Sequence, residues 1–498
     1  MKSFHVPSET FILTGRPITI DAVVAVAVGQ RVEIAPACLS HLAAARTSML
    51  RTLEAGEAVY GITTGVGALK GIRVDAASAS DFNRRLILSH RVSHGNPAPR
   101  SVVRAAMFCR AQGLAMGGSG VRPAVVEALV DALNADDIPV VSILGSVGQG
   151  DLAPLAEIAE ALIARGLVLE TREALALVGA NSFAIGWAAL ALARTMRTLH
   201  ALESATALTM EGFLFNPSVI DPAVFQAYPS PGLKQSVLRL RKLLAGGAIL
   251  TAREKPRLLQ DPLSLRVAPQ AHGSARDAWS HTVKVVEIEL AAASDNPLLT
   301  PDGRLLSVGN FDASGLAAAL DYMRISLAQA LTLSCERVQK LLSQWHTGLP
   351  TGLRERDDLS EDALSIFGHG AAALAAEARL LAQPVSFELP TSSIAESIED
   401  RVTMSSLAAR RLDEQASLAL RLATVELLCA AQAIDLRGRS AALGAGTRAL
   451  YTLVRSHIPL LRAGDSPVAD LDALFTAFEG SLAGAPDELD IPNDEECC

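Results

Sequence analysis

Aromatic residues are scarce in this chain: Phe, Trp and Tyr make up only 4% of its 498 residues, and charged residues only 19%. A β-sandwich core draws on aromatic and β-branched strand residues, so this composition argues against one. Half of the residues are hydrophobic. With few aromatics the core must consist mostly of Ala, Leu and Val, which favours close-packed helices. We therefore predict a mainly α fold, a long-helix bundle with a small mixed N-terminal part.

Basic clusters and export signals are also missing. The net charge is −9, and no run of Lys and Arg is long enough to neutralise a row of phosphates, so no nucleic-acid partner is expected. Residues 1–14 mix Lys2, His5 and Glu9 with apolar residues, unlike a signal or transit peptide. We therefore expect a cytoplasmic protein.

Cysteine is rare as well, with six residues in the whole chain. Cys38, Cys109, Cys335 and Cys429 lie in apolar helical stretches, and the other two end the chain. No pair has the spacing of a zinc site, so no metal is predicted. The expectation is buried, reduced thiols, as in cytosolic proteins.

Three segments sustain a helical pattern of apolar residues for about thirty residues each. They are 182–211, 316–345 and 402–436. The first is apolar enough to raise the question of a membrane span, but Arg194, Arg197 and Glu203 interrupt it. Because charges are costly inside a bilayer, we predict buried bundle helices and no membrane partner.

The remaining elements are expected to be short. Residues 18–20 and 31–34 are predicted as strands, and 124–134 and 152–165 as helices. Asp151 precedes the second of these helices and is a suitable N-cap or first-turn acid for it.

The order of these elements divides the chain into three consecutive parts. We predict an N-terminal mixed domain with active-site loops over 1–210, a central long-helix bundle over 211–440 and a C-terminal helical cap over 441–498.

Two glycine-rich loops are too particular to be linkers. The first is YGITTGVG at 60–67, whose glycines permit tight turns and close approach of the backbone. The second is GSVGQGDLAPL at 145–155, which leads into a helix N-terminus, where backbone amides stabilise negative charge. A phosphate-binding loop is not expected there, because no Lys follows the glycines.

Five further strings complete the pattern. They are QDPLSLR at 260–266, PQ at 269–270, SDNP at 294–297, GNF at 309–311 and EDRVTM at 399–404. In this order and at these separations, from about residue 10 to residue 480, the set resembles the histidine and phenylalanine ammonia-lyase family. The strings LSH at 88–90 and SGVRP at 119–123 add to the resemblance.

This resemblance implies a homotetramer of helical bundles whose active sites draw residues from more than one subunit. It also implies an amino-acid-like substrate and a carbon–nitrogen lyase reaction. In the family an Ala-Ser-Gly triad cyclises and dehydrates to 4-methylideneimidazol-5-one, MIO, an electrophile that makes ammonia a better leaving group.

The resemblance assigns roles to individual residues. Tyr60 matches the base that removes the β-proton, and Glu399 matches the acid near the amino group. Arg266 matches the arginine that pairs with the substrate carboxylate, a role suited to its planar guanidinium. His90 matches the position that histidine-specific members use on the substrate ring.

Three amide side chains complete the predicted pocket. Gln270 and Asn310 match polar residues that line it. Asn181 lies two residues beyond Gly179, which stands where the family has an asparagine, and we expect Asn181 to reach the same space.

The centre of the motif departs from the family. Where the family has Gly-Ala-Ser-Gly-Asp, this chain has Gly148-Gln149-Gly150-Asp151, one residue shorter and without the serine. MIO is therefore not expected to form, and no other cofactor is predicted. Ser146 is a poor substitute, because the branched side chain of Val147 would crowd the amide that must attack.

Two other family positions are changed. Thr63 replaces the asparagine of the tyrosine loop, and Leu263 replaces a second tyrosine. Residues that act as one catalytic unit lose activity non-additively, so several losses imply a different reaction or none.

Structural roles are open for the retained residues. Arg266 could pair with Asp261 or Glu399, Glu399 and Asp400 could cap the helix that begins near residue 402, and His90 could be a satisfied core imidazole.

Three functions remain open. One is an enzyme that acts on an amino-acid-like substrate without MIO, one is ammonia elimination from histidine by an unrecognised electrophile, and one is a non-catalytic protein that binds a ligand or an active paralogue. A base that works near neutral pH would need a tyrosine pKa well below about 10.

Overall fold

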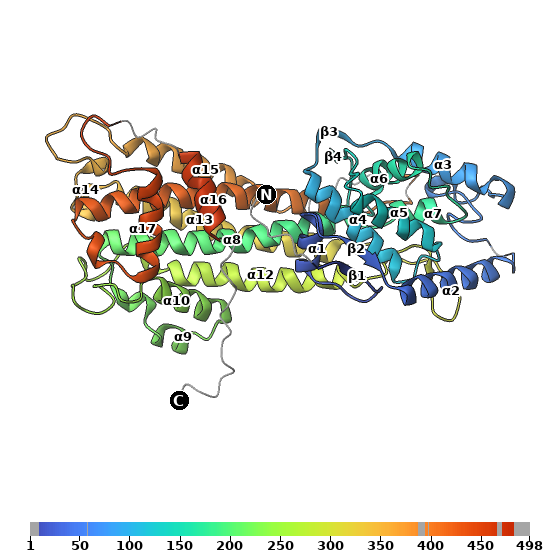
Figure 1. Cartoon of the computed structure of the whole chain (residues 1–498), viewed down its shortest axis with the longest axis horizontal. Coiled ribbons are helices and arrows are strands. Elements are labelled where there is room, and N and C mark those ends of the chain that lie inside the picture. The colour runs from blue at the N-terminus through green and yellow to red at the C-terminus, as the bar shows by residue number, and fades with distance from the viewer. Residues whose placement is uncertain (1–8, 57, 387–393, 397, 466–470, 483–498) are drawn as a thin grey trace. The chain divides into compact units, whose positions relative to one another are not determined.

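The computed structural model describes residues 9–56, 58–386, 394–396, 398–465 and 471–482. Helices dominate these residues (Figure 1). The strands among them form three two-stranded pairs, of which β1–β2 is parallel and the other two are antiparallel. The mainly α fold with a small mixed N-terminal part is therefore confirmed.

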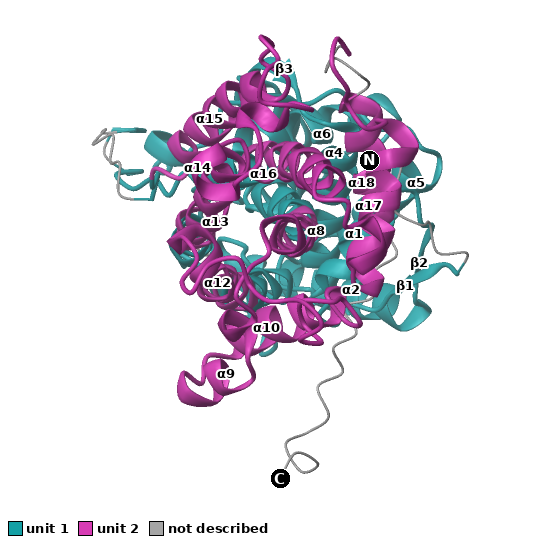
Figure 2. Ribbon diagram, turned by 90° about the vertical axis from the view of Figure 1, so that its left-hand side faces the viewer, with its two compact units in different colours: residues 1–193, 281–321, 384–413 teal, residues 194–280, 322–383, 414–498 magenta. Residues whose placement is uncertain are grey.

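The chain forms two compact units, each built from three separate segments (Figure 2). Unit 1 comprises 1–193, 281–321 and 384–413, and unit 2 comprises 194–280, 322–383 and 414–498. The division into three consecutive domains is a separate prediction that this clustering does not test.

Unit 1 contains every described strand and the shorter N-terminal helices. They are β1 (Phe11–Leu13), α1 (Ile20–Ala27), β2 (Val32–Ile34), α2 (Pro36–Leu53), α3 (Ala79–His90), β3 (His94–Pro97), α4 (Arg100–Ala115), α5 (Pro123–Asn134), β4 (Ser142–Leu144), α6 (Leu152–Ala164), α7 (Glu173–Val178), β5 (Leu298–Leu299) and β6 (Leu305–Leu306).

Unit 2 contains the remaining shorter α-helices. They are α9 (Ala223–Ala227), α10 (Pro231–Leu243), α11 (Leu263–Arg266), α14 (Gln344–Thr347), α15 (Ser365–Leu380), α17 (Ala445–His457) and α18 (Leu471–Leu482). Four longer helices contribute residues to both units: α8 (Ser182–Phe213), α12 (Ala268–Leu290), α13 (Ser314–Leu341) and α16 (Ser405–Leu436).

The first predicted strand is wrong. Residues 18–20 are not a strand, because Thr19 caps α1: its side chain accepts a hydrogen bond from the Ala22 amide and starts a helix at Ile20. The strand that pairs with β2 is Phe11–Leu13. The second predicted strand is confirmed as Val32–Ile34.

The long helices are confirmed with shifted ends. Helix α13 stops at Leu341, and Gln344–Thr347 forms the separate α14, so the last residues of the predicted segment 316–345 were wrong. Helix α16 begins at Ser405, not near 402. Glu399 and Asp400 therefore lie outside its first turn, and the expectation that they cap it is wrong.

Two helical stretches of the described residues, Glu173–Phe213 and Ser405–Leu436, are long and apolar enough to cross a membrane. Their most apolar windows are 94% and 83% buried in the structure. A core helix passes the same test of length and composition, so this is weak evidence for a span. The cytoplasmic location stays a prediction.

The four described cysteines are buried and free, as the sequence predicts. Burial raises the pKa of the Cys109 and Cys429 thiols to about 12, so both are protonated and unreactive near neutral pH. Cys497 and Cys498 lie outside the described residues.

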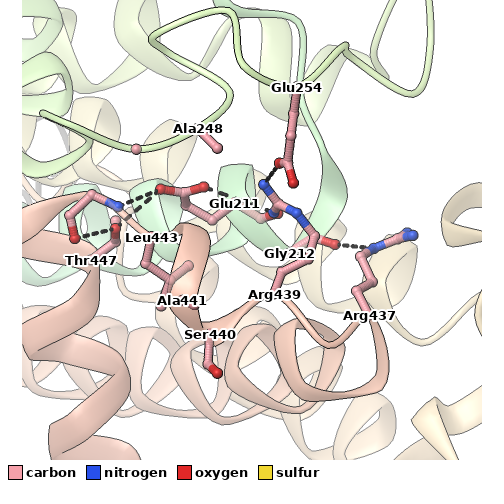
Figure 3. A network of polar contacts seen from close by, with 12 residues as sticks. Glu211, Gly212, Ala248, Glu254, Arg437, Arg439, Ser440, Ala441, Leu443 and Thr447 are labelled. Atoms are coloured by element: carbon pink, nitrogen blue, oxygen red, sulfur yellow. Dashed lines mark hydrogen bonds and ion pairs between the residues drawn. The ribbon is translucent and has the colours of Figure 1, made fainter.

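Unit 2 contains a buried cluster of charged groups around Glu211. Glu211 accepts hydrogen bonds from the Gly444 amide (2.9 Å) and the Thr447 hydroxyl (3.2 Å), while Arg439 donates to the Glu211 main-chain oxygen (2.7 Å) and pairs with Glu254 (Figure 3). A buried charge is tolerated when it is paired and hydrogen-bonded in this way, so this network has a structural role.

Candidate active site

The loop at 145–151 follows β4 and is fixed by hydrogen bonds to the segment before α16. The Thr403 and Met404 amides donate to the Val147 carbonyl at 3.1 and 3.0 Å, and the Thr403 hydroxyl donates to the Gly148 carbonyl at 2.6 Å. Within the loop, the Gly148 amide donates to Ser146 Oγ at 3.1 Å. These bonds hold the loop in one shape.

Asp151 ends this loop and is fully buried. One carboxylate oxygen accepts from the hydroxyls of Ser146 (2.6 Å) and Ser406 (2.7 Å), and the other accepts from the Ala184 amide (2.8 Å). Burial raises the pKa of this carboxyl, and the hydrogen bonds oppose the rise. Asp151 occupies the N-cap position of α6 but makes no side-chain cap there. Its carboxylate instead caps α8, so the predicted cap was assigned to the wrong helix.

Asn181 connects this loop to the GNF segment. Its side-chain oxygen accepts from the Gly150 amide at 3.0 Å, and its side-chain nitrogen donates to the Phe311 carbonyl. The Asp151 amide donates to Ala180 next to it at 2.7 Å. Asn181 is 1% exposed, so it supports the loop that the sequence places at the centre of the site.

Gln149 lies between two glycines in left-handed conformations, with φ of 80° at Gly148 and 79° at Gly150. Its backbone forms an isolated antiparallel bridge with Asp312. The side-chain nitrogen lies 3.5 Å from Asp312 Oδ1. The side-chain oxygen is buried and has no hydrogen-bond partner among the described residues.

Sequence reasoning gave no site role to three charged residues at or around Asp312, which are Asp312 itself, Glu289 and Arg401. The Ser314 amide and hydroxyl donate to Asp312 at 3.1 and 2.6 Å, and Arg401 donates to the Ser314 hydroxyl at 2.8 Å. Glu289, on α12, has its pKa raised to about 7 by burial and then by the negative charge of Asp312. In the sequence, only its position directly after the GNF string pointed to Asp312 as a site residue. Nothing in the sequence pointed to Glu289.

Tyr60 and Glu399 lie close together at the glycine-rich loop 60–67. The Tyr60 hydroxyl accepts from the Gly67 amide at 2.8 Å, and a Cβ added at Gly67 would lie 3.9 Å from Glu399 Oε1. Burial raises the pKa of Tyr60 and the charge of Glu399 raises it further, while the Gly67 amide opposes both. The shift is opposite to the one expected for a base that works near neutral pH.

The other predicted site residues are divided between the two units. Arg266 and Gln270 belong to unit 2; Arg266 donates from Nε to the main-chain oxygen of Asp261 at 2.8 Å, and Gln270 is exposed. In unit 1, Asn310 is exposed and His90 ends α3, with Nδ1 2.8 Å from the Leu86 carbonyl.

The comparisons with known proteins decide the family. The model of the aromatic amino acid lyase family matches residues 18–456. The chain belongs to this family. Among its relatives, the histidine ammonia-lyase of Deinococcus radiodurans is 35% identical over 462 residues, which cover 87% of this chain and 86% of that protein.

Solved structures agree with the lyase fold. The tyrosine aminomutase of Streptomyces globisporus is 27% identical in sequence and superposes with a TM-score of 0.88. The match covers 95% of this chain and 98% of the aminomutase chain. The ergothionase of Treponema denticola superposes with a TM-score of 0.90. The match covers 96% of this chain and 100% of the ergothionase chain. Because it is only 24% identical, it shows the fold alone.

The residues of the loop do not fit the MIO group of this lyase family. No serine stands between Gly148 and Asp151. An alanine at position 148 would not fit either, because its Cβ would lie 2.2 Å from Thr403 Oγ1 and 2.8 Å from the Met404 amide. Ser146 is unsuitable because its hydroxyl donates to Asp151 and accepts from the Gly148 amide, and because the branched side chain of Val147 crowds the nitrogen that would have to attack.

An Ala-Ser-Gly sequence does occur elsewhere, at residues 313–315 beside Asp312, and sequence reasoning missed it. Ring closure would require the Gly315 nitrogen to attack the Ala313 carbonyl. That carbonyl accepts a hydrogen bond from the Ala317 amide at 3.0 Å in the first turn of α13. Closing the ring would break this turn, so these residues do not fit the group as they stand.

Proposed function

We propose that this lyase-family member acts on a small amino-acid-like substrate without MIO, by elimination, addition or cyclisation. The observation that carries the proposal is the loop at 148–151, which holds Gln149 where the family has the serine of its electrophile. The fixed backbone and the steric limit at Gly148 support it.

Tyr60 is the proposed base and Glu399 the group that controls it. With Glu399 ionised and no ligand bound, Tyr60 holds its proton, because the charge of Glu399 disfavours a phenolate. A substrate ammonium placed beside Glu399 would offset that charge. The Gly67 amide, already 2.8 Å from the Tyr60 oxygen, would then stabilise the phenolate that removes a proton.

Arg266 is the proposed partner of the substrate carboxylate, and Gln270, Asn310 and His90 line the pocket. Gln270 and Asn310 are exposed in the single chain. We propose a homotetramer in which such residues from different subunits complete each site.

Histidine ammonia-lyase activity is the second candidate, favoured by the names of the 35% identical relatives. It would require an electrophile other than a ring at 148–151. A third outcome is a protein that binds a ligand and does not convert it.

Substrate conversion tests these candidates. The purified protein is incubated with the common L-amino acids and their unsaturated acids, and conversion is followed by proton NMR. The matched pair of variants is Tyr60→Phe and Tyr228→Phe, since Tyr228 is 66% exposed. Loss of a general base costs about 100-fold or more in rate, so we expect that loss in Tyr60→Phe and none in Tyr228→Phe. Formation of urocanate and ammonia from histidine would favour the second candidate, and binding without conversion the third.

A further inference from the structure

A cavity of about 310 Å³ lies within unit 1, among α4, α5 and α6 (Figure 1). Its floor consists of the side chains of Met107, Ala132, Ile158 and Leu162, all of which are buried. An apolar cavity of about 150 Å³ is enough to hold a benzene molecule. This cavity therefore has room for a small apolar group, and the side chains of its floor are all apolar.

Two charged residues lie at the exposed edge of the cavity. Asp137 follows the end of α5, and Arg165 follows the end of α6. Arg165 donates from Nη1 to the Asp137 carboxylate, and the two side chains are 34% and 61% exposed. Because this edge is open to solvent, a ligand can reach the apolar floor past the ion pair.

Backbone turns fix both charged residues at this edge. At the end of α5 the Asp137 amide donates to the Ala132 carbonyl at 3.0 Å, with Asp136 in a left-handed conformation (φ 55°). At the end of α6, Gly166 (φ 103°) and the Leu167 amide make the same kind of turn. The carboxylate and the guanidinium are therefore held where the two helices end.

The ion pairs at this edge carry a surplus of positive charge. Asp136 is shared by two arginines, because one nitrogen of Arg100 and one of Arg104 each lie 2.9 Å from its Oδ1. With Arg165 paired to Asp137, three guanidinium groups are balanced by two carboxylates. A further anion would restore the balance.

Arg165 is the group that such an anion would meet. Only Nη1 donates to Asp137, and the planar guanidinium can donate two parallel hydrogen bonds to a carboxylate. Helix C-termini favour a cation, but each helix end already has one: Arg104 donates to the Leu133 carbonyl of α5 at 3.1 Å, and Arg165 follows the last residue of α6. Asp137 competes weakly, because exposed ion pairs are easily exchanged.

We propose that this cavity binds a small organic carboxylate with an apolar body, which places its carboxylate on Arg165 and its body against the cavity floor. None of the residues that line the cavity belongs to the candidate active site. The inference therefore does not depend on the proposed function.

A ligand-observed NMR titration of the full-length protein tests the site. The probes are cyclohexanecarboxylate, cyclohexylmethanol and cyclohexylmethylamine, which share an apolar ring and carry an anionic, a neutral and a cationic group. Wild type is expected to bind the carboxylate about tenfold more tightly than the alcohol, as is typical of charge-assisted hydrogen bonds. The amine should bind no more tightly than the alcohol.

Four variants locate the binding. Arg165→Gln should remove the preference for the carboxylate, whereas Asp137→Asn should strengthen carboxylate binding, because it frees the guanidinium. Ala161 also lines the cavity, so Ala161→Leu should weaken binding of every probe. Arg91→Gln is the matched control and should behave as wild type, because Arg91 forms an exposed ion pair with Glu160 of the same helix and does not line the cavity.

The melting temperature of Arg165→Gln without ligand should match that of wild type, since an exposed ion pair contributes little to stability. An unchanged preference for the carboxylate in this folded variant would overturn the inference, as would weaker carboxylate binding in Asp137→Asn. Wild type that binds no carboxylate, or prefers the amine, would also overturn it. Binding lost in Arg266→Gln and kept in Arg165→Gln would assign the carboxylate to the proposed active site, so that the inference fails and the proposed function stands.

Discussion

The loop around Gln149 in unit 1 and the Arg337–Glu426 ion pair in unit 2 differ in how far their buried polar atoms are hydrogen-bonded. In unit 2, Glu426 accepts four hydrogen bonds, two from Arg337 (2.6 and 3.0 Å) and one each from Ser334 (2.6 Å) and Thr209 (2.8 Å). In unit 1, the Gln149 side-chain oxygen is buried without a hydrogen-bond partner among the described residues, while its side-chain nitrogen lies 3.5 Å from Asp312 Oδ1. A saturated network holds a fold together, whereas an unsaturated one beside a rigid loop is suited to a ligand.

Breaking the saturated network should have the largest effect on stability. Arg337→Met leaves the Glu426 carboxylate buried without its counterion, and removing one partner of such a pair costs about 3–5 kcal/mol. We expect that loss in the free energy of unfolding measured with urea. Arg401→Met, at an exposed arginine of the loop site, should cost less than about 1 kcal/mol. Equal losses would contradict the distinction between the two regions.

The steric limit at the loop should give the next largest effect. Gly148→Ala places a Cβ 2.2 Å from Thr403 Oγ1 in a left-handed conformation. Gly246→Ala is the matched control, because Gly246 has nearly the same φ, 79°, and open space around its Cβ. The control should lose about 1–2 kcal/mol of unfolding free energy for the left-handed conformation alone. Gly148→Ala should lose clearly more, and chemical denaturation measures both losses. A smaller loss at Gly148 would show that the loop is not fixed as described.

A buried histidine in unit 2 should make stability depend on pH. Neither ring nitrogen of His272 has a hydrogen-bond partner among the described residues, and burial lowers its pKa to about 3. The unfolded state, with a pKa near 6.5, takes up the proton first, so stability falls as pH drops from about 6.5 towards 3.

Proton uptake by His272 in the unfolded state should lower the free energy of unfolding at pH 5 by at most about 2 kcal/mol relative to pH 7. His272→Leu should therefore reduce the difference between urea midpoints at pH 7 and pH 5, whereas His369→Leu, at an exposed position, should not. An unchanged pH dependence in His272→Leu would show that the imidazole finds a partner in solution.

The smallest effect concerns Tyr60. Because the negative charge of Glu399 raises the pKa of Tyr60, Glu399→Gln should lower it. The measurement is ultraviolet titration of the phenolate, with the same titration in a Tyr60→Phe background subtracted to remove the other three tyrosines. A Tyr60 pKa that stays the same or rises in Glu399→Gln would show that the Glu399 charge does not act on Tyr60. It would contradict the proposed control of the base by Glu399.

The sequence predicted the family, the long helices and the loop at 145–151, because periodicity and motif order are local properties of the chain. It misplaced the first strand, since one hydroxyl cap at Thr19 outweighed a short β-branched run. It could not foresee that Asp151 caps α8 or that Glu289 lies near Asp312. Those contacts depend on the tertiary fold, as does the engagement of Ala313 in the first turn of α13.

The intact mass of the purified protein tests the central claim most directly. MIO formation removes two water molecules from the chain, at whichever serine it occurs. The account predicts the mass of the unmodified sequence, and unmodified serines at 146 and 314 in a peptide map. A mass lower by two waters, with the loss mapped to either serine, would contradict it.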